Sequence, residues 1–191
     1  MFSFFASKIH QHYIKKFNSI WIPDFEDEKT SLAGKLSKNK NLKNVTYIGP
    51  LSRLPLVSKT EEQFDFLCLL SGPEPLRTVL EFLLIEKANE TNKRICVVRG
   101  SNLKIKYDFQ GNLTLIDMPS AETLSRLIEN SHTVICRSGY STLMDLHHLK
   151  KQSVILIPTP GQYEQMYLAN YWKQKFGARL LLQKNLKFFD F

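Results

Sequence analysis

From Phe64 onward, short apolar runs alternate along the chain with longer segments of helical period. Runs rich in β-branched residues and leucine predict strands, and apolar residues spaced three and four apart predict helices. This alternation is typical of an α/β fold, a Rossmann-like doubly wound parallel sheet with helices on both faces. The predicted strands are 65–70, 94–99, 113–117, 133–136, 154–158 and 179–182, and the predicted helices are 75–89, 121–130, 141–149 and 163–176.

Three residues mark predicted helix ends. Pro75 suits a first helical turn, where its missing N–H is not needed. Ser120 is an expected N-cap, and Gly177 is expected to end the preceding helix. The segment 101–112 is too short and too polar for a good helix, so we expect a loop or a hairpin there.

Before Phe64 the pattern changes, and we divide the chain into residues 1–44 and a domain at 45–191. Large apolar side chains stand four residues apart around Lys8–Phe17, which is typical of an amphipathic helix. Such a helix packs on its own domain or on a missing neighbour, or it lies on a membrane surface. The sequence leaves these interpretations open. A further strand is predicted at 44–48.

The chain of 191 residues carries a net charge of +8. This charge favours polyanionic ligands, which include nucleotides, nucleic acid and an anionic membrane face. No apolar run reaches the roughly 18 residues that a membrane-spanning helix needs. The first residues lack the cationic lead-in of a signal peptide.

The cysteines Cys68, Cys96 and Cys136 each stand alone inside an apolar run. This placement predicts buried, reduced thiols and a cytoplasmic location. Neither a CxxC pair nor a Cys/His cluster with zinc spacing occurs in the sequence, so we expect no metal site.

In parallel sheets of this kind, ligands bind where the strands end at their carboxyl edge. Small, amide and charged residues follow most of the predicted strands, and two arginines lie among them. The segments concerned are Ser71–Pro75, Arg99–Ser101, Met118–Ser120, Arg137–Gly139 and Thr159–Gln165. A ligand site is therefore expected at this edge.

The segment 136–145 is the most informative of these. A strand ending in small residues turns at once into a helix, which leaves backbone N–H groups that attract phosphate. Asp145, about one turn further on, offers a carboxylate to ribose hydroxyls. Read alone, the same spacing also fits any strand-to-helix corner of an α/β protein.

Three motifs, in this order and spacing, resemble the C-terminal, donor-binding half of GT-B glycosyltransferases. The segment Val134–Asp145 is similar to the strand, Arg-Ser-Gly turn and acid-bearing helix of glycosyltransferase family 28, which includes the enzyme that forms lipid II. The segment Ile155–Asn170 resembles the family's strand-Pro and Gln-containing helix start. More weakly, Gly49–Arg53 resembles the loop that opens the donor domain.

The resemblance implies a nucleotide-sugar ligand, with a lean to UDP. Ser138, Gly139 and the N–H groups of residues 140–142 would face the diphosphate, with Arg53 or Arg137 adding charge. Asp145 would bind the ribose, Gln165 and Glu164 the sugar, and the Met118 loop the base. The predicted site comprises Arg53, Gly72, Arg99, Met118, Arg137, Ser138, Gly139, Ser141, Thr142, Asp145, Glu164 and Gln165.

The chain also departs from the family pattern. In the loop after the first donor-domain strand, Pro73 removes an N–H and Glu74 brings negative charge. We therefore expect Glu74 to face an acceptor rather than phosphate. Residues 1–44 correspond to little more than a remnant of the acceptor-binding half, and the catalytic base is not identified. The histidines His147 and His148 are assigned to a surface or packing role.

The resemblance implies metal-independent, inverting transfer of a hexosyl or N-acetylhexosaminyl group. The acceptor site and the base would come from an N-terminal domain or a separate subunit, with peripheral contact at the inner face of a membrane. Two alternatives are a non-catalytic interaction subunit with the same fold and a basic nucleic-acid-binding module. The latter lacks a clustered basic run and an aromatic RNA-binding strand, so nucleic acid is not an expected partner.

Overall fold

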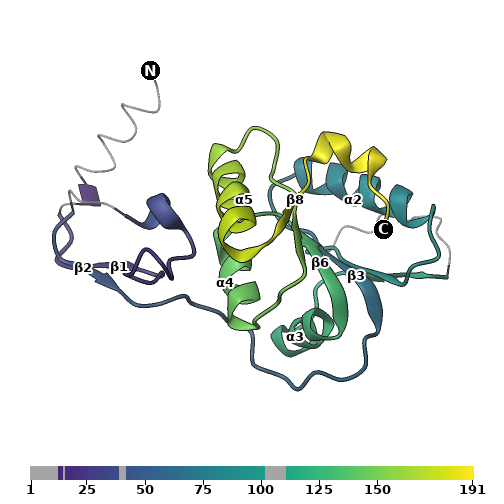
Figure 1. Ribbon diagram of the computed structural model, residues 1–191, viewed down its shortest axis with the longest axis horizontal. Coiled ribbons are helices and arrows are strands. Elements are labelled where there is room, and N and C mark those ends of the chain that lie inside the picture. The colour runs from purple at the N-terminus through teal and green to yellow at the C-terminus, as the bar shows by residue number, and fades with distance from the viewer. Residues whose placement is uncertain (1–12, 15, 39–41, 102–110) are drawn as a thin grey trace. The chain divides into compact units, whose positions relative to one another are not determined.

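The computed structural model describes residues 13–14, 16–38, 42–101 and 111–191 (Figure 1). Contacts divide the chain into two units, Met1–Leu51 and Ser52–Phe191. Most of the helix predicted around Lys8–Phe17, and most of the loop predicted at 101–112, lie outside the described residues.

Unit 2, Ser52–Phe191, is an α/β layer structure. Its strands are β3 (Phe64–Leu69), β4 (Ile95–Val98), β5 (Leu113–Ile116), β6 (Ser131–Cys136), β7 (Val154–Leu156) and β8 (Arg179–Leu180). Its helices are α2 (Leu76–Ala88), α3 (Ala121–Glu129), α4 (Tyr140–His148), α5 (Tyr163–Phe176) and the 3-10 helix η2 (Gln183–Phe188). Every strand pairing is parallel, and the order is β5-β4-β3-β6-β7-β8.

The predicted α/β fold is confirmed, and each predicted strand and helix of this unit begins and ends within two residues of the observed one. The Ser120 side chain caps α3 by accepting a hydrogen bond from the Thr123 N–H. Gly177 ends α5 with φ of 72°, in the left-handed region that favours glycine. The local signals at these helix ends were therefore sufficient to predict them.

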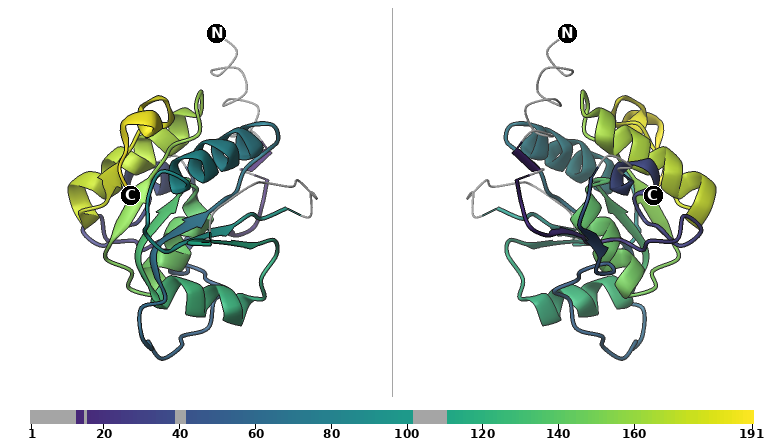
Figure 2. Two further views of the ribbon diagram at one scale, coloured as in Figure 1. Left: turned by 90° about the vertical axis from the view of Figure 1, so that its right-hand side faces the viewer. Right: turned by 90° about the vertical axis from the view of Figure 1, so that its left-hand side faces the viewer.

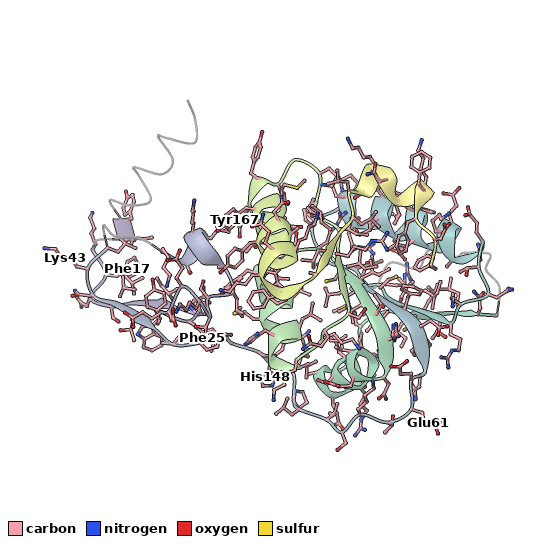
Figure 3. All side chains as sticks on the ribbon, in the orientation of Figure 1. Phe17, Phe25, Lys43, Glu61, His148 and Tyr167 are labelled. Carbon is pink, nitrogen blue, oxygen red and sulfur yellow. The ribbon has the colours of Figure 1, made fainter. Side chains whose placement is uncertain are left out.

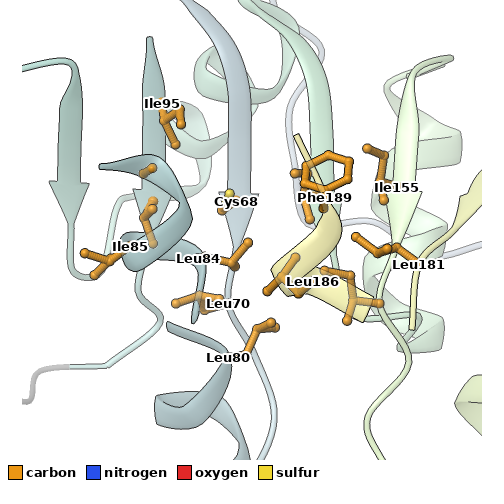
Figure 4. Close-up of a cluster of buried hydrophobic side chains, with 14 of the residues drawn as sticks. Cys68, Leu70, Leu80, Leu84, Ile85, Ile95, Ile155, Leu181, Leu186 and Phe189 are labelled. Carbon is orange, nitrogen blue, oxygen red and sulfur yellow. The ribbon is translucent and has the colours of Figure 1, made fainter. Parts of the chain in front are cut away.

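One face of the sheet is covered by α2 and η2 (Figure 4). Its core is built from strand side chains and helix side chains that are all at most 8% exposed. These include Cys68, Ile95, Val97, Ile135 and Ile155 of the strands, Leu80, Leu84, Ile85 and Leu186 of the helices, and Leu70 and Phe189, which directly follow β3 and η2.

The strand residues that alternate with this set point to the opposite face, among them Leu67, Val134 and Leu156, which are fully buried. Right-handed crossovers place α3, α4 and α5 on this second face. Figure 2 shows α2 and α3 on opposite sides of the sheet. Because helices cover both faces, the strands are apolar throughout rather than alternating, as their sequences predict.

The three cysteines are free and buried, as predicted. Cys68, Cys96 and Cys136 lie in the neighbouring strands β3, β4 and β6. Burial raises the pKa of Cys96 and of Cys136 to about 12 and raises the pKa of Cys68 as well. The thiolate forms that react with electrophiles are therefore almost absent near neutral pH.

We expect no thiol of the folded chain to react with an aromatic disulfide reagent at pH 8, and three to react in 6 M guanidinium, because reaction requires an accessible thiolate. The release of the coloured thiol, followed by absorbance, measures both numbers. A thiol that reacts in the folded protein at the rate of free cysteine would contradict the buried placement.

Unit 1 contains a small sheet, in which β1 (Ile20–Ile22) pairs in parallel with β2 (Val45–Tyr47), and a 3-10 helix, η1 (Gly34–Ser37). The strand predicted at 44–48 is confirmed. Because β2 pairs with β1, it belongs to unit 1, and the two units meet between Leu51 and Ser52.

Asp24 organises the segment between these strands. Its carboxylate is fully buried and accepts hydrogen bonds from the N–H groups of Phe25, Leu32 and Ala33 and from the Ser31 hydroxyl. Burial acts to raise the pKa of Asp24, but these hydrogen bonds outweigh it and hold the pKa below its ordinary value. The carboxylate is thus a structural anchor for the turn of residues 31–33.

Within the described part of the chain, no helix is long and apolar enough to cross a membrane.

Candidate functional site

The strand order reverses direction between β3 and β6. The chain leaves β3 toward β4 on one side and leaves β6 toward β7 on the other. In open α/β sheets, ligands bind at this switch point, beyond the carboxyl ends of the two strands. The segments that follow these strands, Ser71–Pro75 and Arg137–Gly139, flank the expected position.

The N-terminus of α4 lies at this switch point. Gly139 is the N-cap residue in extended conformation, and as a glycine it has no side chain with which to cap the helix. Ser141 in the first turn is exposed and Thr142 is half-buried. The positive end of the helix dipole is thus left for an anion.

Asp145 lies one turn into α4, as the spacing predicts. Its Oδ1 accepts a hydrogen bond of 2.6 Å from the Ser52 hydroxyl, which itself accepts from the Leu54 N–H at 3.1 Å. Asp145 is half-buried, and the neighbouring Arg53 is exposed. The first and third motifs of the sequence are thereby joined in one place, 93 residues apart along the chain.

Ser138 and Gln165 connect the loops after β6 and β7. Ser138 is fully buried, and its hydroxyl donates to the Gln165 carbonyl oxygen at 2.7 Å. The Gln165 side chain accepts from the N–H and hydroxyl of Thr159, both at 3.0 Å, and donates to Gln162 Oε1 at 2.7 Å. Both predicted ligand side chains therefore have internal partners, and the Ser138 hydroxyl faces the interior rather than a diphosphate.

Arg137 is also turned inward, because backbone carbonyl groups surround it. The residue is 1% exposed. Its guanidinium donates to the carbonyl oxygens of Ile157 and Pro158, both at 3.2 Å, and of Leu76 at 3.1 Å. The expectation that Arg137 directly contacts a diphosphate does not fit this placement. Arg53, the other arginine expected to add charge at the diphosphate, is exposed and can reach a ligand.

Arg99 lies in a buried network of ion pairs that the sequence interpretation missed. Glu81 is fully buried between Arg77, at 2.6 Å, and Arg99. Arg99 also pairs with Asp117 at 2.9 Å, and Arg77 pairs with Glu74 at 2.6 Å. Arg99 thus holds α2 against the ends of β4 and β5 and does not point out of the edge as predicted.

Glu74 has a structural role that the sequence interpretation did not assign to it. Besides pairing with Arg77, its carboxylate accepts hydrogen bonds from the N–H and the hydroxyl of Thr78 in the first turn of α2. The hydrogen bond from Thr78 and the pairing with Arg77 hold the pKa of Glu74 below its ordinary value. Its carboxylate thus caps the N-terminus of its own helix. The spacing of Glu74, Arg77, Thr78 and Glu81 along one helix face was the signal in the sequence.

The remaining predicted residues lie at the surface of the same edge. Gly72 and Glu164 are exposed in the turn after β3 and the first turn of α5, and Met118 is 64% exposed after β5. His148, the last residue of α4, lies at the opposite end of that helix from Gly139 (Figure 3). The structure therefore leaves the predicted contacts of Gly72, Met118 and Glu164 open to a ligand.

A hollow of about 390 Å³ lies beside the Gln165 loop and was not predicted from the sequence. Mostly apolar side chains line it, together with Lys184 and Gln183. They come from the segment after β7, the start of α5 and the segment after β8, and they include Pro158, Pro160, Tyr163, Met166 and Leu182. In the described part of the chain, no group of three His, Cys, Asp or Glu side chains is placed to hold a metal ion.

Solved glycosyltransferase structures share this fold. They include the spinosyn forosaminyltransferase SpnP (TM-score 0.53, 12% identity, 74% of this chain and 39% of that one). The spinosyn rhamnosyltransferase SpnG complexed with thymidine diphosphate matches with a TM-score of 0.51 and 14% identity, over 75% of this chain and 40% of that one. SnogD from Streptomyces nogalater matches with a TM-score of 0.56 and 10% identity, over 93% and 48%.

The strand order of the sheet and the similarity to these solved structures show that the chain has the fold of GT-B glycosyltransferases. The chain spans less than half the length of each of the three structures. A family model, the glycosyltransferase family 28 C-terminal domain, matches residues 71–190. The chain therefore belongs to glycosyltransferase family 28. A search of curated proteins found no match.

Proposed function

We propose that unit 2 is the donor-binding half of a glycosyltransferase and that its donor is a UDP-sugar. The observation that carries this proposal is the N-terminus of α4. It lies at the switch point of the sheet and begins at a glycine N-cap. About one turn further on, the Ser52 hydroxyl fixes the Asp145 carboxylate by a 2.6 Å hydrogen bond. One place thus offers N–H groups for a diphosphate and a carboxylate for a ribose.

In this proposal, the charge that develops on the departing diphosphate is stabilised by the helix N–H groups and by Arg53, with no metal required. Transfer inverts the anomeric centre of a hexosyl or N-acetylhexosaminyl group. The exposed Gly72, Met118 and Glu164 line the donor site. The acceptor and the base that takes its proton belong to an N-terminal half or a separate chain, working at the inner face of a membrane.

The proposal is tested by thermal unfolding of the chain with UDP, GDP, dTDP and CDP. A ligand present at 100 times its dissociation constant stabilises the folded state by about 2.7 kcal/mol. We expect UDP to raise the unfolding temperature by several degrees and more than the other nucleotides do. Uridine, which lacks the diphosphate, is the matched control and should have little effect. If no nucleoside diphosphate stabilises the chain, the donor site is wrong.

A further inference from the structure

Arg137 is a buried cation that is bound only by dipoles. Its guanidinium donates to three carbonyl oxygens, and its Nε–H has no hydrogen-bond partner. Carbonyl groups orient a guanidinium but carry no net charge to balance it. Burial lowers the pKa of Arg137 to about 10, so the side chain remains charged at neutral pH.

The other buried arginines of this edge are neutralised. Arg77 and Arg99 share the Glu81 carboxylate, and each pairs with a second acid as well. Among the residues that the structure describes, no aspartate or glutamate forms an ion pair with Arg137. A buried charge without an oppositely charged partner is energetically unfavourable. This cost calls for a balancing charge from outside the chain.

The position of Arg137 indicates where that charge would sit. The residue directly precedes Ser138 and Gly139, the N-cap of α4. Its guanidinium also bonds the carbonyl of Leu76, the first residue of α2. The unbalanced cation is therefore anchored at the first residue of α2, and its own backbone lies two residues before the N-cap of α4. The positive dipole ends of both helices act on an anion in the same direction as the cation does.

We propose that the anionic diphosphate of the donor is the missing counter-charge of Arg137, which strengthens binding through its field from beneath the loop without touching the ligand. This inference rests on the proposed function and extends it to a residue that the ligand does not reach. A fixed charge in a low-dielectric interior attracts an anion at short range more strongly than an exposed arginine does.

The test compares Arg137→Gln with Arg137→Lys by calorimetric titration. Glutamine keeps an N–H donor for the carbonyls but removes the charge, whereas lysine keeps the charge and loses the planar fork. We expect Arg137→Gln to weaken UDP binding about tenfold and to leave uridine binding unchanged. Arg137→Lys should stay within about threefold of the wild type. Inorganic pyrophosphate should follow the pattern of UDP.

Three outcomes overturn the inference. Equal UDP affinity of the wild type and Arg137→Gln would show that the charge of Arg137 does not contribute to UDP binding. Tenfold losses of UDP affinity in both variants would assign Arg137 a purely structural role. If the glutamine variant does not fold, a tenfold loss of UDP affinity in Arg137→Lys alone leads to the same conclusion. A wild-type chain that binds no nucleoside diphosphate would instead overturn the proposed function and this inference with it.

Discussion

Replacing Glu81 with alanine is expected to lower the free energy of unfolding of unit 2 by about 3–5 kcal/mol. Glu81 is fully buried and pairs with Arg77 and Arg99, whose side chains are 3% and 6% exposed. Removing the carboxylate leaves two buried guanidinium groups without their shared counter-charge. The loss would separate α2 from the ends of β4 and β5, which this network holds together.

Urea unfolding followed by tryptophan fluorescence measures this effect. Trp172 is buried in α5, whereas Trp21 is 70% exposed in unit 1, so a Trp21→Phe background isolates the signal of unit 2. The matched control is Glu122→Ala, which removes an exposed partner of Arg126 and should cost less than about 1 kcal/mol. A Glu81→Ala effect no larger than that of the control would contradict the network.

Replacing Asp145 with alanine is expected to weaken UDP binding roughly 10- to 100-fold, since charge-assisted hydrogen bonds contribute about 1.5–3 kcal/mol. The Ser52 hydroxyl holds Oδ1 of the carboxylate, and in the described structure Oδ2 makes no hydrogen bond that would block ribose hydroxyls. Calorimetric titration measures the affinity of each variant. The fold should survive, because Asp145 is half-buried at the surface of α4.

His148→Ala, at the other end of α4, is the control for damage to the helix and should bind UDP like the wild type. The nucleotide dUDP separates the ribose contact from the rest of the site. The substitution Asp145→Ala should weaken dUDP binding less than UDP binding. The reason is that dUDP already lacks the 2′-hydroxyl that donates a hydrogen bond to the carboxylate. Unchanged UDP affinity in Asp145→Ala would contradict the proposed contact between Asp145 and the ribose.

The strands and helices of unit 2 were predictable because their signals are local. An apolar run such as 133–136 and a cap such as Ser120 act within a few residues. The order of the strands was not predictable, since the side chains of a parallel sheet covered on both faces look alike from strand to strand. The same limit applies to the boundary after Leu51, which depends on the pairing of β1 with β2.

The candidate site was predicted in part. The helix start at Gly139 and the spacing to Asp145 follow from local sequence, and the structure places both at the switch point. The bond from Ser52 to Asp145 joins residues too far apart in sequence to be paired by pattern alone.

Arg99 and Arg137 were misplaced for one physical reason. A residue that follows a strand lies at the carboxyl edge, but its side chain turns toward whichever partners are closest. For Arg99 these are Glu81 and Asp117, and for Arg137 they are backbone carbonyls, which leave no trace in the sequence. Backbone position was predictable, whereas side-chain direction was not.

The central position of β3 has a consequence for synthesis in the cell. Phe64 of β3 pairs with Ser131 of β6, so a long stretch of chain must leave the ribosome before that neighbour exists. Ribosomes add roughly 5–20 residues per second, and β3 therefore waits several seconds with an open, apolar edge. Nascent chains should depend on chaperones during this interval. Slower translation should lengthen the interval and increase the fraction of the protein that aggregates in inclusion bodies.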